Sequence, residues 1–172
     1  MITDVTFQFS KAQDLSSVIS PSASPLSYGL AGDKVVLSTN YYNARNLSDT
    51  GGRVQYVHVH VDTAITSSLN YVSLALLLWP DDKTPSLANY QAGDPHVLIE
   101  LPVEKALLVA KSDWYLPLPV SSLDALPTDD WKWLNFAVAF GTTSTGHGGK
   151  VTTSLTDAIT NDPRIFSAKN ST

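Results

Sequence analysis

Two histidines separated by one residue are the most suggestive chemical feature of this sequence. His58 and His60 lie in Val54–Asp62, which alternates apolar and polar residues as a half-buried strand does. Side chains at i and i+2 of a strand point to the same side, so the pair could supply two ligands of a metal site. The neighbouring sequence places no third His, Asp or Glu to complete it. We therefore favour an ordinary polar strand face with no metal, and we expect His96 and His147, each away from other candidate ligands, to be structural or incidental.

Two loop motifs also have simpler explanations than chemistry. Gly146–Lys150 has the composition of a phosphate loop, but phosphate loops lead into a helix and this one leads into a strand. We therefore expect a flexible hairpin tip over Gly141–Gly149. The acidic pairs Asp81–Asp82 and Asp129–Asp130 lie close to prolines, and turn formation explains them.

Two tryptophans suggest a carbohydrate site as an alternative. Trp131 and Trp133 alternate on one predicted strand and would share a face, opposite Leu134 and Phe136. Exposed, they would form a platform for sugar rings, although core packing or a subunit interface is the commoner role of tryptophan. The sequence contains no GxSxG, HExxH or DxDxDG motif. We therefore expect that the protein is not an enzyme and that it has no catalytic residue and no cofactor.

Composition limits the class of protein. The chain has 172 residues, the length of one domain, with 43% hydrophobic and only 16% charged residues. A net charge of −5 and the lack of any Lys or Arg run argue against direct binding of nucleic acid. There is no cysteine, and the start of the chain lacks the features of a signal peptide. The longest apolar stretch, Val72–Trp79, is too short to span a bilayer, so we expect no membrane association.

Period-two alternation predicts most of the secondary structure. The expected strands cover Thr3–Phe9, Lys34–Thr39, Val54–Asp62, Asn70–Trp79, His96–Leu101, Ala106–Ala110, Trp114–Pro119, Trp131–Phe140 and Lys150–Ala158. Asn70–Trp79 is apolar on both faces, which indicates a central strand, and the prolines of Trp114–Pro119 indicate an edge strand. Lys83–Pro95 is expected as a surface loop, and only Ser121–Leu126 as a helical turn.

These elements predict an all-β fold, an antiparallel β-sandwich of the jelly-roll type with about eight strands. Residues 1–172 are expected to form a single domain. The terminal segments 1–13 and 161–172 are expected to be mobile or docked at an interface.

The order of the segments from Val54 onward carries a family resemblance. A strand ends in Asp-Thr-Ala (VHVHVDTAITSS), an apolar strand runs into an acidic turn (NYVSLALLLWPDD), and HVLIELPVEKALLV follows. A proline-marked stretch (WYLPLPV) then precedes a Trp/Leu strand and a Gly-rich tip (WKWLNFAVAFGTTSTGHGGKVTTSLTDAI). This order resembles that of the jelly-roll capsid cement proteins, or head decoration proteins, of tailed bacteriophages. The resemblance covers roughly residues 54–160.

The resemblance implies a structural protein of the virion. Such a protein would be made in the host cytoplasm, bind the outside of the head and bridge subunits of the major capsid protein, as a homotrimer. It implies no site residues. Two other functions remain open: a single jelly-roll major capsid protein, and a carbohydrate-binding module that uses Trp131 and Trp133.

Overall fold

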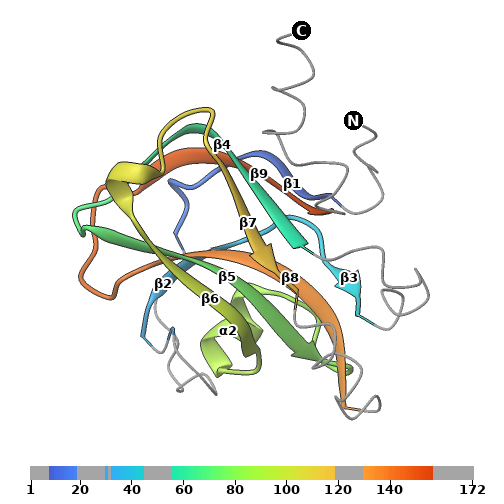
Figure 1. Ribbon diagram of the computed structural model, residues 1–172. Coiled ribbons are helices and arrows are strands. Elements are labelled where there is room, and N and C mark those ends of the chain that lie inside the picture. Colours follow the sequence, from blue (N-terminus) through green and yellow to red (C-terminus); the bar gives the residue numbers. More distant parts are fainter. Residues whose placement is uncertain (1–7, 19–29, 31, 45–55, 119–129, 157–172) are drawn as a thin grey trace, which may run out of the picture.

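Two antiparallel sheets form a β-sandwich (Figure 1). The computed structural model describes residues 8–18, 30, 32–44, 56–118 and 130–156. Sheet A has the strand order β1 (Gln8–Asp14), β9 (Gly148–Thr156), β4 (Tyr56–Thr66) and β7 (Asp113–Pro117). Sheet B has the order β2 (Lys34–Leu37), β8 (Trp131–Phe140), β5 (Tyr71–Pro80) and β6 (His96–Glu104). The short β3 (Tyr42–Asn43) also pairs with β8.

The strand order is that of a jelly roll. β2 pairs with Ala137–Phe140 of β8, and β3 pairs with Trp133 and Leu134 further along the same strand. The two therefore act as one interrupted edge strand, which leaves eight strands in two four-stranded sheets, as a jelly roll has. Every connection crosses from one sheet to the other except those within this interrupted strand and between β5 and β6. The predicted fold is confirmed.

The core between the sheets follows the predicted alternation. Val57, Val59 and Val61 of β4 are fully buried, and they face apolar side chains of sheet B. Those side chains are Leu74, Leu76, Leu78, Leu134, Phe136, Val138 and Phe140. Each such side chain contributes roughly 1.5–3 kcal/mol by leaving water. β5 lies between β8 and β6, so the predicted central strand is confirmed, and β7 lies at the edge of sheet A as its prolines indicated.

The outer face of sheet B carries a second apolar cluster, which contradicts the expectation of a plain surface loop over Lys83–Pro95. Within this segment α2 (Leu87–Ala92) packs on the side of sheet B that faces away from sheet A (Figure 1). The side-chain oxygen of Ser86 caps its start, and Gly93, at φ 81°, ends it. Tyr90 is completely buried among apolar residues of sheet B. A helix of six residues is too short for hydrophobic periodicity to reveal.

Other predicted elements differ in the structure or lie outside the described residues. Ala106–Ala110 was predicted as a strand, but Lys105–Leu107 forms a 3-10 turn, η2, and Leu107 and Val109 are 54% and 52% exposed. This apolar run is therefore not a buried strand. Within the terminal segment 1–13, residues 8–13 belong to β1 and pair with β9. Residues 1–7, 161–172 and the predicted turn Ser121–Leu126 lie outside the described residues.

Candidate functional site

His58 and His60 meet at one carboxylate on the outer face of sheet A. Asp113 of β7 lies directly opposite His60 in the strand register. His58 Nε2 and His60 Nδ1 lie 2.7 and 2.9 Å from the same oxygen, Asp113 Oδ1. The two rings use opposite nitrogens in these contacts, and each nitrogen is the donor wherever Asp113 is an ionised carboxylate, which only accepts hydrogen bonds. These three residues are called the His–Asp–His cluster below.

Aromatic rings enclose this cluster on one side. Tyr115 of β7 stacks on the His58 ring, with centroids 4.9 Å apart and planes 15° from parallel. Tyr56 meets the Tyr115 ring edge-on at 6.4 Å. The exposed fraction is 14% for the His58 side chain and 34% for that of His60. The cluster is therefore half-buried, and its hydrogen bonds fasten the edge strand β7 to β4.

The cluster is arranged for hydrogen bonding and not for metal binding. Both nitrogens are at ordinary hydrogen-bond distance from one oxygen, whereas ligands about 2.0–2.2 Å from a shared ion stand further apart from one another. Within the described part of the chain, no group of three or more His, Cys, Asp or Glu side chains could hold a metal ion. The hydroxyl of Thr152, opposite His60 on β9, donates to Asp62 and so does not form a nucleophile–histidine pair.

Removing Asp113 is expected to weaken the attachment of β7. Asp113→Ala leaves two half-buried ring N–H groups without an acceptor, and we expect the free energy of unfolding to fall by about 1–3 kcal/mol. Urea denaturation measures this loss, and amide exchange should rise first in β7. Asp82→Ala, an exposed turn residue, is the matched control and should change stability by no more than about 0.5 kcal/mol. Equal effects of the two substitutions would refute a stabilising role for the cluster.

The other two histidines do not join this cluster. The His96 ring packs against Trp131 at 5.8 Å, and burial lowers its pKa from 6.5. The His147 ring packs on Phe140 at 4.6 Å. Burial lowers the pKa of His147 from 6.5, and the positive charge of Lys34 lowers it further. Both rings therefore favour the neutral form and serve as packing groups at the ends of the sandwich.

The glycine-rich segment after β8 is not the hairpin tip that we expected. β8 and β9 belong to different sheets, so Gly141–His147 crosses the open end of the sandwich. Hydrogen bonds hold this crossing in place: Lys34 Nζ donates to the Ser144 carbonyl at 2.9 Å, and the Thr145 N–H donates to Ser68 Oγ at 2.9 Å. The segment leads into β9, as predicted, which leaves no helix terminus for a phosphate.

The acidic pair Asp81–Asp82 lies in a turn, as expected. Asp81 follows β5; its carboxylate pairs with Lys132 at 2.8 Å, and its carbonyl accepts from Trp133 Nε1 at 3.3 Å. These contacts give Asp81 a structural role in the turn. Asp129 lies outside the described residues.

Trp131 and Trp133 do not share one face, contrary to our expectation. The register of β5 with β8 shifts between Trp79 and Pro80, which pair with Trp133 and Trp131. A bulge of this kind reverses the side to which the following side chain points. Trp131 packs against the cluster between the sheets, and Trp133 against the outer cluster beneath α2. A two-tryptophan sugar platform is therefore not formed.

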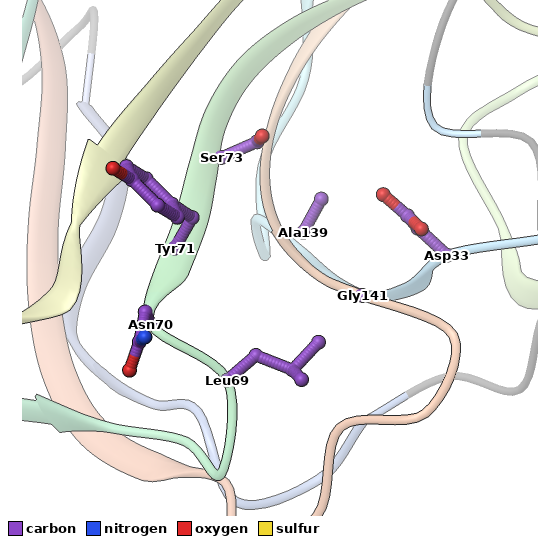
Figure 2. Close-up of a pocket in the computed structure, with 7 residues that line it drawn as sticks. All are labelled: Asp33, Leu69, Asn70, Tyr71, Ser73, Ala139 and Gly141. Atoms are coloured by element: carbon purple, nitrogen blue, oxygen red, sulfur yellow. The ribbon is translucent and has the colours of Figure 1, made fainter.

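A pocket that the sequence did not predict opens on the outer face of sheet B beside the cluster under α2. It has a volume of 340 Å³ and is lined by Asp33, Leu69, Asn70, Tyr71, Ser73, Ala139 and Gly141 (Figure 2). The small residues of β5 and β8 form its floor, and Asp33 points into it from the segment before β2. A Cβ at position 141 would overlap the end of the Leu69 side chain, so a larger residue there would require Leu69 to move.

Asp33 is the electrostatically unusual group of the pocket. Burial raises its pKa from 3.8, the negative charge of Glu100 raises it further, and hydrogen bonds from Thr142 lower it in part. Glu100 accepts a hydrogen bond from Ser73 Oγ at 2.9 Å. Among the described residues, Asp33 is thus the one carboxylate that lines the pocket, and the exposed carboxylate of Glu100 lies close enough to repel it.

These features define an all-β protein of the jelly-roll class, with a hydrogen-bonded His–Asp–His cluster on one sheet and an acidic pocket on the other. No protein-family model matches the chain, and neither the curated proteins nor the solved structures include a significant match. In the described residues, no helix has the length and apolar character needed to cross a membrane.

Proposed function

We propose that this protein is a capsid decoration protein that binds the outside of a viral head and stabilises contacts between subunits of the major capsid protein. The observation that supports the proposal most directly is the strand order, because jelly rolls with this order build many viral capsid proteins. The order of sequence segments from Val54 to about residue 160 supports the same proposal through its resemblance to the cement proteins of tailed bacteriophages.

The surface of the chain suits such a role. Only 16% of the residues are charged, so few strongly hydrated groups must lose water on contact with a capsid. Two apolar side chains of the β6–β7 connection, Leu107 and Val109, are more than half exposed. We propose that the protein acts as a homotrimer, because simultaneous contacts of a trimer with several subunits raise its effective concentration on the shell.

Binding to assembled heads tests the proposal. Heads of the virus that encodes this chain, stripped of the protein, are mixed with increasing amounts of the purified protein, sedimented and then heated. We expect saturable co-sedimentation and a higher temperature of head disruption. A protein that binds only the assembled shell stabilises it by about 2.7 kcal/mol per site at a free concentration about 100 times Kd.

Two outcomes would contradict the proposal. If the purified protein assembles into closed shells by itself, it is a single jelly-roll major capsid protein, which the same strand order permits. If it neither binds heads nor forms shells, the decoration role is wrong. Mass measurement of the purified protein is a separate test of the trimer, and a clean monomer would contradict that part alone.

A further inference from the structure

We propose that the pocket on the outer face of sheet B binds the cationic side chain of an arginine or a lysine presented by a partner protein. The identity of that partner as a capsid subunit rests on the proposed function. The occupant itself is inferred from the charge, the size and the rim of the pocket alone.

Two carboxylates, Asp33 of the pocket lining and the exposed Glu100 just outside it, stand on opposite sides of a floor made of small residues. Ser73 and Ala139 face each other across β5 and β8, and both point away from the core between the sheets. Asp33 reaches in from the β2 side (Figure 2). Glu100, on β6, receives the hydrogen bond of Ser73 from the other side. A cation resting on this floor would lie between two negative charges.

Neither carboxylate has a cation of its own in the described part of the chain. Lys34, which directly follows Asp33, donates instead to the Ser144 carbonyl, and Lys132 pairs with Asp81. Asp33 is partly buried and accepts hydrogen bonds from Thr142, but burial and the negative charge of Glu100 both disfavour its ionised form, which costs free energy. A cation from outside would offset this cost.

The size and rim of the pocket fit a long side chain with a charged end. A volume of 340 Å³ lies within the range of pockets that hold small ligands. Leu69 and Ala139 offer apolar contact for an alkyl stem, and arginine and lysine combine such a stem with a charged head. Tyr71, 61% exposed, lies on the rim with its ring directed away from Asp33 (Figure 2). An exposed tyrosine beside a charged pocket is typical of surfaces that another protein covers.

A titration followed by NMR tests the pocket without any capsid. Isotope-labelled protein is titrated with Nα-acetyl-arginine amide, and in parallel with Nα-acetyl-citrulline amide, which has nearly the same shape but no charge. We expect saturable shifts of the Ser73, Ala139 and Gly141 amide signals with the arginine compound only. Asp33→Asn should weaken this binding about tenfold, because a charge-assisted hydrogen bond is lost.

Asp82→Asn is the matched control, since it removes the same charge from an exposed turn and should leave the affinity unchanged. The proposal is overturned if the arginine compound gives no local shifts, if the citrulline compound gives the same shifts, or if Asp33→Asn binds as well as the original protein. Arginine binding without head binding would overturn the decoration role and leave the pocket standing. Head binding without arginine binding would overturn the pocket proposal and leave the decoration role standing.

Discussion

Replacing Tyr90 with alanine is expected to lower the free energy of unfolding by about 3–5 kcal/mol, the usual range for removing a large buried aromatic side chain. Tyr90 is 0% exposed and packs with Trp79 and Leu77 in the cluster on the outer face of sheet B. Its hydroxyl donates to the Asp33 carbonyl at 3.1 Å, which also ties α2 to the segment before β2. Urea denaturation followed by tryptophan fluorescence measures the loss.

Tyr71→Ala is the matched control, because Tyr71 is 61% exposed. It should change stability by no more than about 0.5 kcal/mol. If Tyr90→Ala behaved like Tyr71→Ala, α2 would contribute little to stability, and the outer cluster would not be part of the cooperative core.

Among substitutions that add one methyl group in sheet A, Gly149→Ala is expected to lower the free energy of unfolding most. Gly149 has φ 105°, a region that side chains rarely adopt, and an added Cβ would lie 2.8 Å from the Ala64 carbonyl oxygen and from Ile65 Cα. These are backbone atoms of the adjacent strand β4, so relief requires the strands to separate. We expect a loss of about 2–4 kcal/mol, the sum of backbone strain and overpacking, measured by thermal and urea unfolding.

Gly146→Ala separates the two contributions. Gly146 has φ 65°, but an added Cβ would have no heavy atom within 4 Å. This variant should therefore show the conformational cost alone, about 1 kcal/mol. Equal losses of unfolding free energy for the two variants would mean that the close approach of β9 to β4 does not contribute to the effect of Gly149→Ala.

Much of the fold follows from local pattern. Alternation in Val54–Asp62 and Trp131–Phe140 identifies the side chains that fill the space between the sheets, and prolines identify an edge strand. The errors arise where tertiary context decides. The apolar run Ala106–Ala110 forms a turn that buries only Leu108, and a polar segment around Tyr90 forms a capped helix over a sheet face.

The candidate sites depend on strand register, which the sequence does not state. His58 and His60 are recognisable as a pair, but Asp113 lies 53 residues from His60 in the chain and meets it only because β4 and β7 pair in one particular register. A bulge separates Trp131 from Trp133, and no local signal marks it. Similarly, Asp33 precedes β2 and Ser73 lies on β5, far apart in the sequence, so the acidic pocket has no sequence motif.

The pairing of β1 with β9 has a consequence for synthesis on the ribosome. Ser10 Oγ and Thr153 Oγ1 bond to each other at 2.8 Å across 143 residues of chain. β1, the first of the described strands, therefore cannot pair with β9 until the last described strand has been synthesised. Strand pairs this distant in sequence fold slowly, because the entropy of closing the loop must be overcome before the contacts form. Sheet A is thus completed only after translation has passed residue 156. Until then Phe9, fully buried in the finished protein, remains available to chaperones.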